Sequence, residues 1–105
     1  DKVARNQFQT LSEPMYYILL ALLTPCYGYE IMQKITEISK GRVQVGAGTL
    51  YALLARFENE GIINQIADDG RRKTYVATDL GKELLRQEIK RLKSMSEEGE
   101  ALLDQ

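Results

Sequence analysis

The sequence has no histidine and no tryptophan, and Cys26 is the single cysteine among its 105 residues. Without histidine the chain lacks the usual proton shuttle and the commonest metal ligand. One thiol builds neither an internal disulfide nor a metal site, and we expect Cys26 to be a small packing residue. These absences argue against an enzyme, a metal and any other cofactor. A lone thiol also fits the reducing environment of the cytoplasm.

Long apolar runs and an excess of one charge are missing as well. The longest apolar run, Pro14 to Leu23, is too short for a membrane span and lacks the flanks of a signal peptide, so we expect neither. The chain has 14 basic and 15 acidic residues, a net charge of -1. Any nucleic-acid binding must therefore come from a local basic patch, and the run Arg71, Arg72, Lys73 provides one.

What is present is an ordinary globular composition, 44% hydrophobic and 28% charged, at a length that fits one domain. Apolar spacing and turn residues predict the elements in order. They are a helix from Ser12 to about Thr24, a turn at Tyr27-Gly28-Tyr29, a helix ending near Lys40-Gly41, a strand at 42–45, a helix from Gly46–Thr49 to Gly61, strands at 62–67 and 74–77, and a helix from Asp79 to about Leu103.

This order describes a mainly helical fold with a small β-hairpin wing, a winged helix-turn-helix with a long C-terminal helix. We expect one compact unit, in which residues 1–78 form the winged helix with an N-terminal arm and residues 79–105 form a dimerisation helix. The third predicted helix turns an apolar back inward. Its outward side is suited to a DNA major groove because most of its residues are small: Gly48, Thr49, Ala52 and Ala55, flanked by Tyr51 and Arg56.

The hairpin tip and the last helix complete the predicted interfaces. Arg71, Arg72 and Lys73 are expected to neutralise DNA phosphates from the wing. The last helix carries an apolar seam that no later sequence covers, and the first helix is apolar on two faces, which favours a second subunit. We therefore predict dimer contacts at Tyr16, Leu20, Leu85, Ile89, Leu92, Met95 and Leu103.

Each of these features also has a plainer interpretation. The basic run is consistent with a solvated turn, Thr49 with a helix cap, and Tyr51 with a rim tyrosine. Arg56 is placed to pair with Glu60 along its helix. The apolar seam of the last helix also suits packing against its own domain.

Taken together in order, four groups of residues resemble the PadR-like family of winged-helix transcriptional regulators over most of the chain. They are 17–23 (YILLALL), 27–31 (YGYEI), 48–51 (GTLY) with Leu54, Arg56, Glu58 and Gly61, and 70–73 (GRRK) with Tyr75, Thr78 and Gly81. The single C-terminal helix is similar to the short branch of that family.

The resemblance implies a cytoplasmic bacterial homodimer that binds double-stranded DNA at a pseudo-palindromic operator and represses its own or neighbouring genes. It places Gly48, Thr49 and Tyr51 in the recognition helix and residues 71–73 in the wing, and it adds Lys34 and Arg42 as weaker phosphate contacts. It also implies release by a small aromatic effector. An apolar cavity between subunits is expected at Phe8, Tyr16, Tyr17 and Met95, although the tryptophan that stacks drugs in some relatives is missing.

Two other functions compete with this interpretation. A winged helix also serves as a protein-interaction module without specific DNA binding, and the near-zero net charge favours that alternative. An enzyme would have only carboxylates, lysines and tyrosines to work with. Salt-dependent DNA affinity separates the first alternative from a DNA-binding regulator, and a turnover screen addresses the second.

Overall fold

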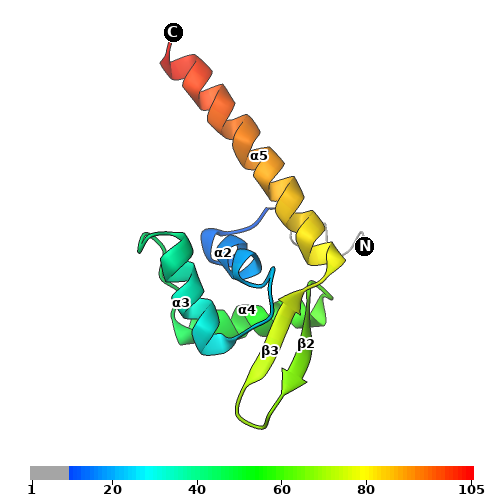
Figure 1. The fold of residues 1–105 in the computed structure, drawn as a ribbon. Coiled ribbons are helices and arrows are strands. Elements are labelled where there is room, and N and C mark those ends of the chain that lie inside the picture. Colours follow the sequence, from blue (N-terminus) through cyan, green and yellow to red (C-terminus); the bar gives the residue numbers. More distant parts are fainter. Residues whose placement is uncertain (1–9) are drawn as a thin grey trace.

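A computed structural model describes residues 10–105 (Figure 1). Helices α2 and α3 precede helix α4, a β-hairpin follows, and one long helix ends the chain. The elements are α2 (Glu13–Ala21), β1 (Cys26–Tyr27), α3 (Gly28–Ile38), α4 (Ala47–Asn59), β2 (Ile63–Asp68), β3 (Lys73–Ala77) and α5 (Asp79–Leu103). The predicted fold class, mainly helical with a small β-hairpin wing and a long last helix, is confirmed.

Local side-chain contacts explain where the first helices begin and end. The Ser12 hydroxyl accepts from the Met15 N–H at 3.4 Å and caps α2, as its position before Pro14 predicts. Helix α2 ends at Ala21, earlier than Thr24, because the carbonyl of Leu22 accepts from the N–H of Ala77 at 2.8 Å. That bond turns the chain out of the helix and toward β3.

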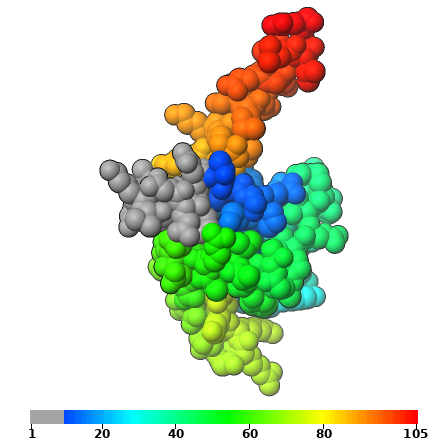
Figure 2. Space-filling view, turned by 180° about the vertical axis from the view of Figure 1, so that it is seen from behind, coloured from blue at the N-terminus to red at the C-terminus, as the bar shows by residue number. Residues whose placement is uncertain are grey.

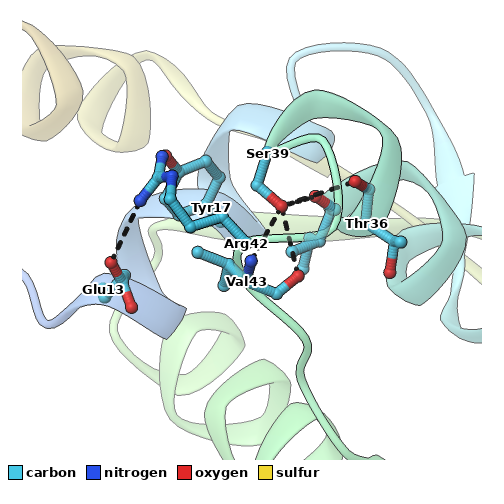
Figure 3. Close-up of polar contacts among 7 residues, drawn as sticks. Glu13, Tyr17, Thr36, Ser39, Arg42 and Val43 are labelled. Atoms are coloured by element: carbon cyan, nitrogen blue, oxygen red, sulfur yellow. Dashed lines mark hydrogen bonds and ion pairs between the residues drawn. The ribbon is translucent and has the colours of Figure 1, made fainter.

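The sheet is antiparallel in the order β1-β3-β2, and one of its strands is not where the alternation predicts. The prediction of a strand at 42–45 is wrong: this segment is a loop, and Cys26–Tyr27 forms the short strand. The loop is held by Ser39, whose hydroxyl accepts from the Val43 N–H at 3.0 Å and donates to the Val43 carbonyl at 3.2 Å (Figure 3). The alternation therefore marks the burial of two valines, while the strand position beside β3 belongs to β1.

One hydrophobic core joins all the helices. Its fully buried side chains are Ile18, Leu19, Leu22, Ile31, Ile35, Leu50, Leu54, Phe57, Ile62 and Ile63. The start of α5 enters this core through Leu84 and Leu85, which are 2% and 3% exposed. The wing and the far half of α5 project from opposite ends of the body, in a molecule of 57 × 34 × 21 Å (Figures 1 and 2).

Candidate nucleic-acid interface

Helix α4 has a deeply buried back and an open front. Leu50, Leu54 and Phe57 are at most 1% exposed, which fixes the helix against the core. The opposite side is solvent-exposed and consists largely of the predicted small residues, Gly48, Thr49, Ala52 and Ala55, with Arg56. This front lets the helix backbone approach a flat or grooved partner closely.

The first turn of α4 is open as well. Its N-cap is Gly46, which has no side chain to accept from the first-turn N–H groups, and no acidic residue stands in that turn. The backbone N–H groups and the positive end of the helix dipole therefore face solvent, an arrangement that favours a phosphate.

The tip of the β2–β3 hairpin, which we call the wing tip (residues 68–73), is held by its two aspartates. Asp68 accepts from the Gly70 N–H at 2.9 Å, and Asp69 accepts from the N–H groups of Arg71 and Arg72 at 3.0 and 2.7 Å. Hydrogen bonds from Arg72 and then Arg71 hold the pKa of the Asp69 carboxyl below its ordinary value. The two acids thus shape the turn from which the cations project, and Gly70 accommodates its φ of +89°.

A groove of about 680 Å³ separates α4 from the wing. Tyrosine rings and basic side chains dominate its lining, which comprises Tyr27, Gly28, Tyr29, Tyr51, Leu54, Ala55, Glu58, Arg71, Arg72, Lys73 and Tyr75. Burial raises the pKa of Tyr75, and the negative charge of Glu58 raises it further, so this phenol stays protonated at neutral pH. The structure thus brings the three predicted wing cations to the same groove as α4.

Tyr51 spans from α4 to the start of α3. A β-carbon added at Gly28 would lie 2.3 Å from the Tyr51 hydroxyl oxygen, so only glycine lets that hydroxyl reach the α3 backbone. The ring remains 54% exposed along the groove. Tyr51 therefore combines an internal contact with a surface that a ligand in the groove can reach.

The two weaker predicted phosphate contacts bond to other residues of the chain, although the Arg42 side chain remains 63% exposed. The Lys34 ammonium donates to the Ala21 carbonyl at 3.2 Å and to the Thr24 hydroxyl at 2.6 Å, so it caps the carboxyl end of α2. Arg42 donates to the Tyr17 hydroxyl at 2.7 Å and lies 3.6 Å from the Glu13 carboxylate (Figure 3). Neither lines the groove between α4 and the wing.

The predicted dimer residues fall into two groups. Leu85 is 3% exposed and belongs to the core, and Tyr16 and Leu20 are half-buried against that core. Four apolar residues of α5 face solvent along the helix: Ile89 at 36%, Leu92 at 40%, Met95 at 53% and Leu103 at 86%. The predicted dimer residues that remain exposed therefore all lie on α5, from Ile89 onward.

The predicted effector residues are only partly described. Phe8 lies outside the described residues. Tyr16 and Tyr17 meet edge to face with ring centroids 5.4 Å apart, and the Met95 sulfur accepts from the Arg91 guanidinium at 2.9 Å. None of these three residues lines the groove beside α4.

Sequence reasoning did not predict Tyr27, Gly28 or Glu58 as site residues. Tyr27 lies under the Arg72 guanidinium, Glu58 lines the groove, and Gly28 accommodates Tyr51. The spacing of Asp68 and Asp69 before Gly70 was a readable signal for a bonded turn. The contacts of Tyr27 and Gly28 are between residues distant in sequence, and no local pattern marks them.

Residues 10–105 contain neither a metal-binding cluster nor a membrane-spanning helix. No group of three or more histidine, cysteine, aspartate or glutamate side chains comes together there to hold a metal ion. In the same part of the chain, no helix combines the length and apolarity that crossing a bilayer requires.

Known proteins resemble this chain in both sequence and fold. The family model of the transcriptional regulator PadR-like family matches residues 18–87. An uncharacterised protein of Lysinibacillus sphaericus is 38% identical over 68 residues, a match that covers 61% of this chain and 62% of that relative. The match thus spans less than two thirds of the relative's length.

Solved structures match over nearly the whole chain. A PadR-like transcription factor from Bacteroides fragilis superposes with a TM-score of 0.72 at 26% identity, covering 97% of this chain and 99% of that one. A PadR family transcriptional regulator from Eggerthella lenta gives 0.71 at 25% identity, covering 97% and 82%. The agreement includes α5, which the family model covers only in part.

Proposed function

Because this chain belongs to the transcriptional regulator PadR-like family, we propose that it is a sequence-specific DNA-binding regulator of transcription. The family is one of transcriptional regulators and not of enzymes. Our full proposal is a cytoplasmic homodimer that represses its own or neighbouring genes from a pseudo-palindromic operator. The observation that carries the proposal is the pairing of an open, small-residue α4 front with a basic wing tip across one groove.

Helix α4 would read bases. A major groove about 12 Å wide admits a helix whose front lacks bulky apolar groups. Gly48, Ala52 and Ala55 meet that requirement, and Thr49 offers a hydroxyl near the open amino end of the helix. The buried back of α4 keeps the helix in one orientation while it is inserted.

The wing would bind the backbone. Arg71, Arg72 and Lys73 are exposed at the tip, and the loop that carries them is closed by the Asp69 hydrogen bonds. Phosphate contacts of this kind add affinity at every sequence and make binding depend on salt.

The exposed half of α5 supports the dimer. Its exposed apolar residues lie on a helix whose far half projects from the body (Figure 1). A two-fold dimer presents both α4 helices to one side of the duplex, so half-sites would be about one helical turn apart, roughly 10 bp.

The first test is fluorescence anisotropy of the purified chain on its own upstream DNA and on a scrambled duplex, each at about 50 and 200 mM salt. We expect a preference for the upstream DNA that persists at the higher salt. Absence of binding even at the lower salt would contradict the proposal and favour a protein-interaction module.

Matched variants separate the two proposed contacts. Arg71→Ala with Arg72→Ala should weaken binding to both duplexes and flatten the salt slope by about 1 per lost phosphate contact. Lys90→Ala with Lys93→Ala removes the same charge from exposed positions on α5 and serves as the control. Thr49→Ala should lower affinity for the upstream duplex alone. If the wing and α4 variants behave alike, the assignment of reader and wing is wrong.

The proposal extends to an effector. We propose that a small aromatic compound releases the DNA by binding near Tyr16, Tyr17 and Met95, where subunits would meet. Titration calorimetry with a panel of planar aromatic compounds tests the effector proposal. If none of the compounds gives a heat of binding, the effector proposal is wrong.

A further inference from the structure

The wing tip has little apolar support of its own. In β2 only Ile63 is buried, and the other residues of the strand are exposed, including Ile66 at 52%. The tip beyond them consists of exposed polar and charged residues. Its position over the groove must therefore be set by specific contacts rather than by hydrophobic burial.

Arg72 is held at both its backbone and its side chain. Its N–H donates to the Asp69 carboxylate at 2.7 Å, and its carbonyl accepts from the Asp69 N–H at 3.2 Å. Its guanidinium carbon lies 4.6 Å from the centroid of the Tyr27 ring, within the range of a cation–π contact. Arg72 is thus anchored to the tip by one residue and to the body of the protein by another.

Tyr27 contacts both the wing and the helices of the body, so it can fix the position of one relative to the other. It pairs with Thr74 of β3, and its N–H donates to the Glu30 carboxylate at 3.2 Å at the start of α3. The next residue, Gly28, lies directly under the hydroxyl of Tyr51 from α4. A continuous set of contacts therefore runs from the wing through the start of α3 to the helix that would read bases.

From this geometry we infer that Tyr27 is a positioning residue for the wing, whose ring holds the Arg72 guanidinium at a fixed distance from α4 and ready for a DNA phosphate. The inference rests on the proposed function, since it names the side chain that orients one of the proposed phosphate contacts.

The chemistry of the two groups fits this role. A guanidinium carries five N–H donors, so a contact between its charge and one ring leaves donors open for a phosphate. Holding the side chain in place before binding reduces the conformational entropy that the contact costs. The ring adds no charge, and its loss should lower affinity without removing an ionic contact.

The test measures DNA affinity of the full chain on its upstream duplex across the same salt range. Tyr27→Leu should weaken binding about 2- to 5-fold, as expected for an exposed cation–π contact, and leave the salt slope unchanged. Arg72→Ala should flatten the slope by about 1. Tyr27→Phe keeps the ring and should restore the wild-type affinity.

A double-mutant cycle decides whether Tyr27 acts through Arg72. Tyr27→Leu should have no further effect in the Arg72→Ala background. Tyr29→Leu is the matched control, because Tyr29 lines the same groove and is 61% exposed, and its effect should be equal in both backgrounds. Equal effects of Tyr27→Leu in both backgrounds would overturn the inference, as would a Tyr27→Phe variant as weak as Tyr27→Leu.

A measurement without DNA keeps the inference testable if Tyr27→Leu perturbs folding. In proton NMR of the wild-type chain the Arg72 side-chain protons should be shifted upfield by the Tyr27 ring, and Tyr27→Phe should retain that shift. Unshifted Arg72 protons would also overturn the inference. Failure of the wild-type chain to bind DNA would instead refute the proposed function, so the two failures are distinguishable.

Discussion

The two halves of α5 share one helical periodicity and differ in what covers them. In the first half Leu84, Leu85 and Glu88 are 2–3% exposed within the chain's own fold. In the second half Leu92 is 40% exposed and Leu102 69%. An apolar stripe in the sequence therefore indicates that one face of a helix is suited to burial. Only the tertiary structure shows which part of that face is buried within the same chain.

An ion pair between the buried Glu88 and the partly exposed Arg91 lies at the boundary between the halves. The Glu88 carboxylate accepts from Arg91 at 2.9 and 2.5 Å, and a further hydrogen bond reaches it from the Leu11 backbone. The contact ties the segment before α2 to α5 at the point where the helix leaves the body. The four predictions below test whether the halves differ as this description requires.

The largest loss of folding stability is expected from substitutions in the first half of α5. Leu84→Ala removes a buried side chain and should lower the free energy of unfolding by about 2–5 kcal/mol. Leu102→Ala, the same change at an exposed position, should alter the free energy of unfolding of the single chain by less than about 0.5 kcal/mol. Urea unfolding followed by circular dichroism measures both, and equal losses would contradict the proposed difference between the halves.

Substitutions in the second half of α5 should weaken the association of two chains instead. Leu92→Glu places a charge in the proposed dimer interface and should weaken the dimer by at least about 2 kcal/mol, roughly 30-fold. Ser94→Glu adds the same charge at another exposed position of α5 and is the control. Sedimentation at several concentrations measures the change, and a Leu92→Glu variant that associates like the wild type would remove this face from the dimer.

Removing the Glu88–Arg91 ion pair should lower the folding stability by an intermediate amount that depends on pH. Hydrogen bonds from Arg91 hold the pKa of Glu88 below its ordinary value, and the bond from Leu11 acts in the same direction. Because the folded-state pKa is depressed, this stability is complete above the unfolded value near 4.3 and is lost as pH falls through the folded value. Arg91→Ala should lower the stability at neutral pH and reduce the part of it that is lost in acid, because the Glu88 carboxylate loses its charged partner.

That prediction is checked by chemical unfolding from neutral pH down through the acid range. Arg86→Ala removes a guanidinium from an exposed pair with Glu83, at 3.6 Å, and is the matched control. Its effect should be below about 1 kcal/mol. An Arg91→Ala variant with an unchanged acid limb would show that Glu88 does not carry this dependence.

The smallest changes in folding stability are expected from alanine substitutions at two glycines of α5. The two changes should have opposite signs. A β-carbon at Gly81 would meet the Ile62 carbonyl oxygen at 2.4 Å, so Gly81→Ala should destabilise the fold by about 1–3 kcal/mol. Gly99 has no atom within 4 Å of that position, so Gly99→Ala should stabilise the helix by about 0.5–1 kcal/mol. Thermal unfolding at two protein concentrations separates this helix effect from association, and the same sign for both would contradict the packing of α5.

Local chemistry made much of the fold predictable. The hydroxyls of Ser12 and Thr78 cap α2 and α5, and α5 runs from Asp79 to Leu103 as its spacing predicts. The wing loop follows from its Asp-Asp-Gly sequence. The error at 42–45 has a physical reason: alternation reports which side chains are buried, whereas a strand also requires a neighbour, and β1 occupies the place beside β3.

In the candidate site, too, features within one short segment could be predicted and contacts between distant segments could not. The small exposed front of α4 and the position of the three cations at the hairpin tip follow from the sequence because each lies within one short segment. The contacts that Lys34 and Arg42 make within the chain do not, because the sequence around a basic residue does not show which partner its side chain will meet. Their partners Ala21 and Tyr17 are distant in sequence and meet them only in the folded chain.

Residue types and short spacings were enough to predict the helices, the wing loop, the family resemblance and the lack of histidine chemistry. Three features could be seen only in the folded chain: Cys26–Tyr27 forms a strand, the Tyr27 ring lies under Arg72, and the fold buries α5 only as far as about Glu88. These contacts join segments far apart in the chain, and only folding sets the distances between them.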